Sequence, residues 1–292
     1  MADLAATVAE LREDREHGAS WMARRTVETL LEVAEQPFES CEALVDNLVD
    51  AARSLAESRP RIGAIPGAAG RVVAAANGWR HLDLDDFRQL IREEGQAVLD
   101  GRERAAASIA IHLSERLEDA VAVTHSASAT VREALLHTPP KRVLCTVSEP
   151  IGEGRAFADG LRSEGLDVEL VDDADGPDAV RDATILLVGV DTVFADGTLC
   201  NKIGTTALAQ SASLSEVPTV VAAEIVKLAP MEAADAPDPG PAERELFELT
   251  PPELLTVIVT EEGAFAPAEI AHLVDRTPFL REGYALLQPT RA

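Results

Sequence analysis

The side chains best suited to chemistry in this chain lie in one segment, residues 189–205, which reads GVDTVFADGTLCNKIGT. It offers the carboxylate of Asp191, the amide of Asn201 and the ammonium group of Lys202. The segment follows an apolar, β-branched run at residues 184–188, which is typical of a strand covered on both faces of a parallel sheet. Ligands of open α/β sheets bind at the carboxyl ends of such strands. The pattern therefore predicts an anion site in which Lys202 supplies charge and Asn201 supplies hydrogen bonds.

Small and hydroxylated residues stand at two predicted helix starts. The chain at Gly204 can open a helix whose first amides face an anion. The segment THSAS, residues 124–128, ends another predicted strand, and its hydroxyls point the same way as the free amides of the next helix. Ser126 and Ser128 are therefore predicted phosphate ligands or, as the open alternative, simple N-caps. His125 beside Ser126 does not create a nucleophile and base pair, and no Ser-His-Asp order can be assigned, so a serine hydrolase is not indicated.

Two further features near strand ends have an ordinary structural alternative. Lys227 follows the apolar run PTVVAAE and can close on an anion, although a lysine there can also lie along the surface or pair with Glu224. Gly152 and Gly154 imitate the start of a dinucleotide fingerprint, but the third glycine is missing at the required spacing. These glycines are predicted to form a turn, and no nicotinamide cofactor is expected.

The charge composition is strongly acidic. There are 51 Asp and Glu residues against 26 Lys and Arg, which gives a net charge of −25, and the lysines are Lys141, Lys202 and Lys227 alone. Salt screens the self-repulsion of such a chain, so we interpret it as a protein of a halophilic, archaeal cytosol, with an ordinary acidic protein as the alternative. The acid excess also argues against direct nucleic-acid binding, which needs clustered basic residues.

Length and cysteine content bound the class of protein. A chain of 292 residues with 46% hydrophobic content can bury a large core and would ordinarily divide into two domains. No apolar run approaches the roughly 18 residues of a membrane-spanning helix, and the acidic, amphipathic N-terminus does not resemble a signal peptide. Cys41, Cys145 and Cys200 are widely spaced and form no metal-ligand pattern. We therefore expect a cytoplasmic protein with no membrane contact, metal or cofactor.

The periodicity of the apolar residues changes near residue 118. Up to Leu117 they recur at spacings of three and four, which predicts an all-helical region. The predicted helices cover residues 3–14, 19–36, 40–57 and 84–117. From Asp119 on, short apolar runs alternate with helical stretches, as in the repeated βα units of a parallel, doubly wound sheet. The predicted fold is α/β, with a helical domain at residues 1–117 and a Rossmann-like parallel-sheet domain at residues 118–292.

Five segments together resemble one known family. In chain order they are THSAS, SEPIGEGRAFA, GVDTVFADGTLCNKIGT, VPTVVAAEIVK and FELTPPELLTVIVTEEG. They are similar to the family that unites the alpha, beta and delta subunits of translation initiation factor 2B with sugar-phosphate aldose–ketose isomerases, and the resemblance covers nearly the whole chain. It implies a helical N-terminal domain, a Rossmann-like C-terminal domain without a nicotinamide cofactor, and dimers or larger assemblies built through the C-terminal domain.

The resemblance also implies roles for single residues. In the isomerase branch, which includes ribose-1,5-bisphosphate and methylthioribose-1-phosphate isomerases, a cysteine and an aspartate act as base and acid on the sugar. Asp191 matches the aspartate, but Ser126 stands at the cysteine position. The other matches imply contacts with a phosphorylated ligand by Gly18, Arg59, Ser126, Ser128, Thr130, Asn201, Lys202 and Lys227.

Three departures from the family pattern argue against isomerase activity. A thiol, with a pKa of about 8.5, is partly ionised at neutral pH, whereas the hydroxyl of Ser126 is a far weaker acid and needs its own base. No neighbour in the sequence obviously supplies that base. His17 and Glu149 stand where the isomerases have arginines, and each replacement removes permanent positive charge from a site meant for phosphates.

The resemblance, with these departures, implies a non-catalytic, initiation factor 2B-like regulatory subunit. We expect it to bind a phosphorylated sugar or nucleotide, to self-associate, and to contact initiation factor 2 or sibling subunits. One alternative is a sugar-phosphate aldose–ketose isomerase, similar to ribose-1,5-bisphosphate isomerase, that uses Asp191 with Ser126 or a neighbouring group in place of the cysteine. A second alternative is a scaffold whose C-terminal sheet serves only for dimerisation.

Overall fold

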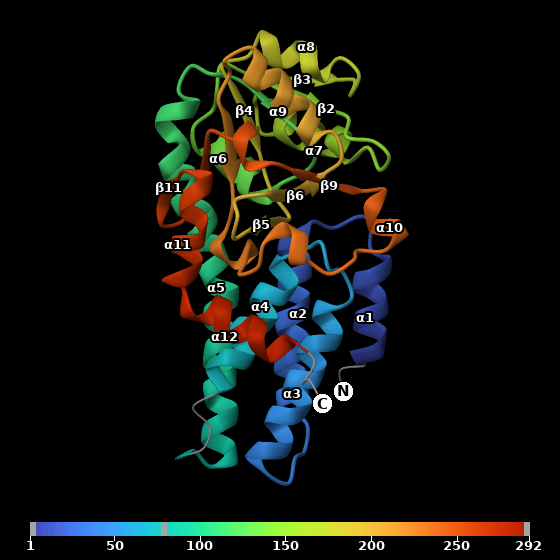
Figure 1. The fold of residues 1–292 in the computed structure, drawn as a ribbon, viewed down its shortest axis with the longest axis vertical. Coiled ribbons are helices and arrows are strands. Elements are labelled where there is room, and N and C mark those ends of the chain that lie inside the picture. Colours follow the sequence, from blue (N-terminus) through green and yellow to red (C-terminus); the bar gives the residue numbers. More distant parts are fainter. Residues whose placement is uncertain (1–3, 77–80, 289–292) are drawn as a thin grey trace.

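The computed structural model describes residues 4–76 and 81–288, with a helical part and a sheet part stacked end to end (Figure 1). The helical part comes first and contains α1 (Leu4–Glu13), α2 (Ala19–Ala34), α3 (Cys41–Ala56), α4 (Ala64–Ala75) and α5 (Leu84–Leu117). The 34-residue α5 runs from the far end of the helical part up to the sheet. None of the described helices, α5 included, combines the length and the hydrophobicity needed to cross a bilayer.

The starts and inner faces of these helices follow from the local sequence. Asp83 caps α5 by accepting hydrogen bonds from the amides two and three residues further on, at 3.0 and 2.9 Å. Ser40 caps α3 in the same way. Apolar residues at helical spacing then form the core, in which Leu30, Leu48 and Phe87 are fully buried. Three of the four predicted helices begin within a residue of their observed starts, and the start of the predicted 3–14 helix falls on a residue outside the described part.

Helix α4 does not appear among the predicted helices. Pro66 stands in its first turn, where a missing amide breaks no intrahelical hydrogen bond. A Cβ atom added at Gly67 would lie 1.9 Å from the carbonyl oxygen of Val226, and one added at Gly70 would lie 3.0 Å from the backbone of Gly283. The glycines that hide α4 from pattern analysis are thus the residues that let it pack closely against the C-terminal half of the chain.

The main sheet has seven strands among the described residues, in the order β11-β10-β7-β4-β1-β2-β3. Its parallel strands are β1 (Val121–Thr124), β2 (Arg142–Thr146), β3 (Val168–Val171), β4 (Ile185–Val188), β7 (Thr219–Ala222) and β10 (Val257–Thr260), and β11 (Gly263–Phe265) is antiparallel to β10. Around it lie α6 (Ala129–His137), α7 (Glu153–Ser163), α8 (Gly176–Arg181), α9 (Thr205–Leu214) and α11 (Ile270–Asp275). The predicted α/β class, a helical region followed by a largely parallel sheet, is confirmed.

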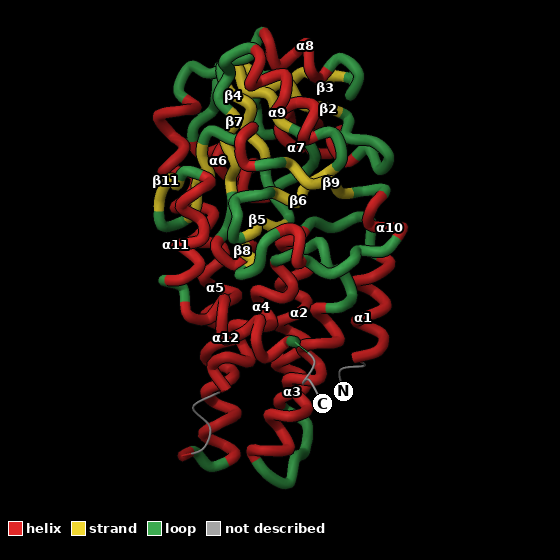
Figure 2. The backbone as a smooth tube through the Cα atoms, in the orientation of Figure 1, coloured by secondary structure: helices red, strands yellow, loops and turns green. Residues whose placement is uncertain are grey.

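A second, smaller sheet was not predicted. It contains β8 (Leu228–Ala229), β5 (Thr192–Phe194), β6 (Leu199–Lys202) and β9 (Phe247–Thr250), in the order β8-β5-β6-β9. It lies between the main sheet and the helical part (Figure 2). Strands of two to four residues leave no alternating run long enough to recognise. Because β6 pairs with β9, Asn201 and Lys202 are held in register opposite Glu248 and Phe247.

The last described helix, α12 (Pro278–Leu287), returns to the helical part and packs against α4 and α3. There Arg53 donates a hydrogen bond to the carbonyl oxygen of Leu286 at 3.1 Å. The division of the chain into domains at residues 117 and 118 stays a prediction, and α12 makes contacts across it.

Candidate functional site

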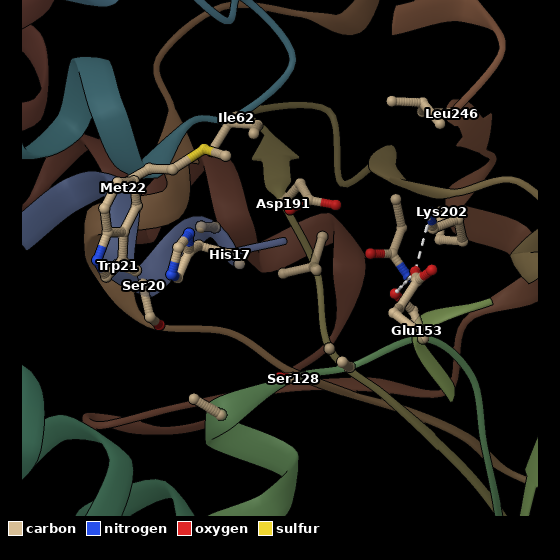
Figure 3. A pocket seen from close by; sticks show the side chains of 18 of the residues that line it. His17, Ser20, Trp21, Met22, Ile62, Ser128, Glu153, Asp191, Lys202 and Leu246 are labelled. Carbon is tan, nitrogen blue, oxygen red and sulfur yellow. Dashed lines mark hydrogen bonds and ion pairs between the residues drawn. The ribbon is translucent and has the colours of Figure 1, made fainter. Parts of the chain in front are cut away.

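A cavity of about 300 Å³ lies where the first turn of α2 meets the carboxyl ends of β1 and β4 (Figure 3). These two strands are neighbours in the sheet, and the chain order reverses between them, which is where open α/β sheets bind ligands. All the predicted site residues except Thr130 line the cavity: Gly18, Arg59, Ser126, Ser128, Asp191, Asn201, Lys202 and Lys227. The structure thus brings these residues together, while their roles stay predictions.

Asp191 lies in the loop between β4 and β5, with its carboxylate on the cavity. Its backbone is fixed on both sides, because its amide donates to the carbonyl oxygen of Cys200 and its own carbonyl oxygen accepts from the amide of Gly63, each at 3.1 Å. Burial raises the pKa of Asp191 to about 6, although the cavity cations, Lys227 first and Lys202 second, act to lower it. A carboxyl group with that pKa exchanges protons readily near neutral pH.

The cavity wall opposite Asp191 carries a carboxylate that sequence reasoning missed. Glu153 begins α7, and its Oε1 accepts a hydrogen bond from Ser126 Oγ at 2.6 Å and lies 2.8 Å from Lys202 Nζ (Figure 3). The expectation that no base lies beside Ser126 is therefore wrong. Ser126 and Glu153 are 27 positions apart in the sequence, so no local spacing pointed to this contact. The turn predicted at Gly152 and Gly154 was a signal for a helix start at Glu153, because α7 begins there.

Ser126 is held in an uncommon backbone conformation by its neighbours. Its φ is 65°, in the left-handed region, and its amide donates to Ser148 Oγ at 2.7 Å. His125 is engaged away from Ser126, with Nδ1 2.6 Å from Thr146 Oγ1 and Nε2 2.9 Å from the carbonyl oxygen of Ile203. Burial lowers the pKa of His125, and because a carbonyl only accepts, we assign the neutral tautomer with its proton on Nε2. The expectation that His125 is no base for Ser126 agrees with this geometry.

Arg59 is buried at the cavity edge and is already paired. Its Nε donates to Glu243 Oε1 at 2.6 Å, and its Nη1 donates to the carbonyl oxygen of Asp14 at 3.0 Å. Its guanidinium also lies 5.8 Å from the ring centre of Phe247. Arg59 therefore ties the end of α1 to α10 (Pro241–Arg244) and to the start of β9. Its charge is balanced by Glu243, a residue that sequence reasoning did not single out.

Lys227 is the last residue of a short 3-10 turn, η2 (Ile225–Lys227), and it is paired more loosely than Arg59. Its Nζ lies 3.9 Å from Glu224 Oε1, which is beyond hydrogen-bonding distance. Glu224 accepts instead from Thr130 Oγ1 at 3.1 Å, Ser20 Oγ at 3.3 Å and Arg102 Nε at 3.3 Å. Burial acts to raise the pKa of Glu224, but these cations and hydrogen bonds lower it on balance. Thr130 thus lies behind the cavity wall, where it supports Glu224.

The helix starts around the cavity differ in what they face. At the start of α9, Glu248 Oε1 accepts from the amides of Gly204 and Thr206 at 2.9 and 2.8 Å, so the anion predicted there is a side chain of the protein itself. Ser128 caps α6 by accepting from an amide at 3.3 Å, as its alternative role predicts. At the start of α2, Gly18 offers no side-chain cap and lies beside the THSAS turn, where a Cβ atom added at Gly18 would be 3.8 Å from the carbonyl oxygen of Ala127. The first turns of α2 and α6 therefore meet at the cavity.

The two residues that the resemblance places at arginine positions, His17 and Glu149, have different surroundings. His17 lines the cavity, with Nδ1 2.7 Å from Asp14 Oδ2 and its ring stacked on Trp21 at a centroid distance of 4.1 Å. Glu149 does not line the cavity, because it is exposed and pairs with Arg155 at 3.2 Å. The expectation that Glu149 removes charge from the site is therefore not matched by its place in the structure.

The described residues that line the cavity are nearly balanced in charge. They include the cations Arg15, Arg59, Arg132, Lys202 and Lys227, and the carboxylates Asp14, Glu16, Glu153 and Asp191. Two further carboxylates, Glu224 and Glu243, pair with cavity cations from behind. In the part of the chain that the structure describes, no cluster of His, Cys, Asp or Glu is arranged to hold a metal ion. The site is therefore suited to a small polar ligand that carries few negative charges.

Known proteins of two kinds resemble this chain. It is 31% identical over 273 residues to the putative translation initiation factor eIF-2B subunit 2-like protein of Pyrococcus abyssi, which covers 88% of this chain and 94% of that protein. It is also 29% identical over 297 residues to the ribose 1,5-bisphosphate isomerase of Archaeoglobus fulgidus, which covers 94% of this chain and 93% of the isomerase. The relatives therefore carry both of the names that the sequence resemblance implies.

Solved structures share the fold. The crystal structure of the tetrameric eIF2B-beta2-delta2 complex from C. thermophilum contains a chain that matches with a TM-score of 0.79, at 17% identity, over 94% of this chain and 93% of that one. Residues 15–267 match the Initiation factor 2 subunit family. The resemblance read from the sequence is confirmed, and the chain belongs to the Initiation factor 2 subunit family.

Proposed function

We propose that this chain is an initiation factor 2B-like regulatory subunit whose cavity binds a phosphorylated sugar or nucleotide without converting it. One observation carries the proposal: the hydroxyl of Ser126, at the position that the family resemblance assigns to a catalytic thiol, donates its hydrogen bond to Glu153. The cavity nevertheless keeps Asn201 and Lys227, which suit a phosphate ester. Binding without turnover is the behaviour of a sensor.

The cysteines support a non-catalytic role. Cys41, Cys145 and Cys200 all lie outside the cavity lining. Burial raises the pKa values of the Cys145 and Cys200 thiols, which keeps them protonated at neutral pH. No thiol of the chain is therefore available to take over the proton transfer that the isomerase branch assigns to cysteine.

The test measures binding and turnover on one preparation in molar salt. Calorimetry with ribose 5-phosphate and with adenosine monophosphate reports binding, and an assay with ribose 1,5-bisphosphate reports turnover. We expect binding of a monophosphate and no turnover. Co-purification with initiation factor 2 then tests the regulatory role. A protein that binds no phosphorylated ligand and no initiation factor would refute the proposal.

A sugar-phosphate aldose–ketose isomerase is the second candidate, and two observations favour it. Asp191 has a pKa of about 6, and Glu153 places a carboxylate against Ser126 on the opposite wall. Two carboxylates facing one cavity can act as base and acid on a sugar. Turnover of ribose 1,5-bisphosphate that disappears in Asp191→Asn would establish the isomerase and overturn the regulatory proposal.

Self-association through the C-terminal half belongs to the same proposal. Its support is the assembly named for the C. thermophilum structure and two exposed apolar side chains: Ile203, in the turn after β6, is 40% exposed, and Leu249, on β9, is 41% exposed. Strand β9 forms one edge of the smaller sheet. We expect a dimer or larger assembly in sedimentation, and a shift toward monomer in Leu249→Lys. A monomeric native protein would contradict this part of the proposal.

A further inference from the structure

Glu153 differs from the other carboxylates that pair with cavity cations. Glu224 and Glu243 reach Lys227 and Arg59 from behind and do not line the cavity. Glu153 does line it, and its side chain is 21% exposed. Of these three acids it is therefore the one whose charge a bound ligand meets directly.

Both hydrogen-bond donors around Glu153 converge on the same oxygen. Ser126 Oγ is 2.6 Å and Lys202 Nζ is 2.8 Å from Oε1, whereas Oε2 is buried and has no partner in the described part of the chain. The ammonium group of Lys202 and the hydroxyl of Ser126 are thereby withdrawn from a ligand. A lysine bound to a carboxylate at 2.8 Å contributes little net charge to its surroundings.

We propose that Glu153 sets the ligand class of the cavity, a step that rests on the proposed function. It makes the wall formed by Ser126 and Lys202 neutral and hydrogen-bonding, so this wall accepts ligand hydroxyls and rejects a second phosphate. The single phosphate is held by Lys227, whose Nζ donates no hydrogen bond within the part of the chain that the structure describes, and by the first turn of α2, which has no side-chain cap. The ligand is therefore a sugar or nucleoside monophosphate with free hydroxyls, and a sugar bisphosphate is excluded.

The physical basis is the difference between the two groups that the wall meets. A sugar hydroxyl has a proton to donate to a carboxylate, whereas an ionised phosphate oxygen has none and is repelled by it. The cavity is small and partly closed, so this repulsion is screened less than on the open surface. Removing the charge of Glu153 while keeping its shape should then relax the discrimination.

The test compares ribose 5-phosphate with ribose 1,5-bisphosphate by calorimetry at one salt concentration, for the native protein and Glu153→Gln. The native protein should bind the monophosphate more tightly. Glu153→Gln should strengthen binding of the bisphosphate by about tenfold, the order expected for one unit charge in a partly screened site, and change the monophosphate by less than about threefold. Glu153→Ala, which removes the carboxylate altogether, should act in the same direction and guards against a misfolded glutamine variant.

Glu149→Gln is the matched control. It removes the same charge four residues away, but Glu149 is 57% exposed and outside the cavity, so both affinities should stay as in the native protein. An unchanged ratio in Glu153→Gln, equal effects of the two variants, or turnover of the bisphosphate by the native protein would overturn the inference. Failure of the proposed function looks different, because neither sugar phosphate would then bind to any of the proteins.

Discussion

Two clusters that each contribute a lysine to the cavity are built from the same kinds of residue and behave differently. In one, Glu153 pairs with Lys202 and accepts from Ser126; in the other, Glu224 pairs with Lys227 and accepts from Thr130. The first ion pair is tight, at 2.8 Å, but one oxygen of its carboxylate has no hydrogen-bond partner among the described residues. The second is loose, at 3.9 Å, yet both oxygens of its carboxylate accept hydrogen bonds.

A carboxylate beside a lysine can therefore stabilise the fold or act on the ligand. Glu224 is 4% exposed and joins Arg102 of α5 to Thr130 of α6, so it stabilises the contact between the helical part and the sheet part. Because these other donors satisfy Glu224, the ammonium group of Lys227 remains available. Glu153 instead forms an ion pair with Lys202 and accepts a hydrogen bond from Ser126, two residues that line the cavity.

The largest expected effect is a loss of stability when a substitution disrupts the second cluster. Glu224→Gln removes the countercharge of Arg102 and one of the two carboxylates that act on the buried Lys227, the other being Asp191. Removing one partner of a buried pair costs about 3 kcal/mol of unfolding free energy. Glu153→Gln is the matched variant and should cost less, because the side chain of Glu153 is 21% exposed, against 4% for Glu224, and Glu153 pairs with one cation rather than two. Chemical denaturation of both variants measures the difference. Equal losses would show that the two carboxylates have the same role.

The second expected effect concerns Asp191. The charges of both lysines lower its pKa, that of Lys227 more than that of Lys202. Its folded pKa of about 6 lies above its ordinary value of 3.8, so the folded state binds more protons between these pH values. The stability that this group contributes is therefore present at low pH and lost as the pH rises through that window, by up to about 3 kcal/mol. Relative to the native protein, Asp191→Asn should gain stability between pH 4 and pH 7.

Unfolding free energies at pH 4, 5, 6 and 7 test this expectation. Asp46→Asn, at an exposed position of α3, is the control and should follow the native curve. The comparison of clusters adds a second readout: Lys227→Met should raise the pKa of Asp191 further than Lys202→Met does, since the charge of Lys202 is balanced by Glu153. A larger rise in Lys202→Met would mean that the tight pair does not cancel its charge.

Lys202, Lys227 and the pairing of Lys227 with Glu224 were predictable from the sequence, whereas the carboxylates that pair with Lys202 and Arg59 were not. Lys202 and Lys227 follow apolar runs, and the ends of parallel strands meet at one edge of a sheet, so local pattern and topology suffice to place them. Glu153 and Glu243 reach the site from 27 and 184 residues away from the side chains they contact. Such contacts depend on how elements pack, which no local spacing encodes.

The parts of the fold that were missed have a related cause. Helix α4 carries Pro66, Gly67 and Gly70, which weaken any helical pattern, and its close packing against distant backbone is what requires the two glycines. The smaller sheet is made of strands too short to alternate recognisably. Similarly, the anion at the start of α9 was foreseen, but its source, Glu248 on β9, depends on a strand pairing that was not. Local rules thus gave the long elements and the charges, while tertiary contacts decided how the charges are balanced.

The smallest expected effect tests directly whether Lys202 and Lys227 contribute differently to phosphate binding. Lys202→Met combined with Glu153→Gln removes the tight pair at constant net charge, so binding of ribose 5-phosphate should change by less than about threefold, whereas Lys227→Met alone should weaken it by about tenfold. Calorimetry of both proteins beside the native one decides the matter. If the charge-balanced double variant loses as much affinity as Lys227→Met, then Lys202 separates from Glu153 when the ligand binds and contacts the phosphate itself. The two clusters would then bind the ligand in the same way.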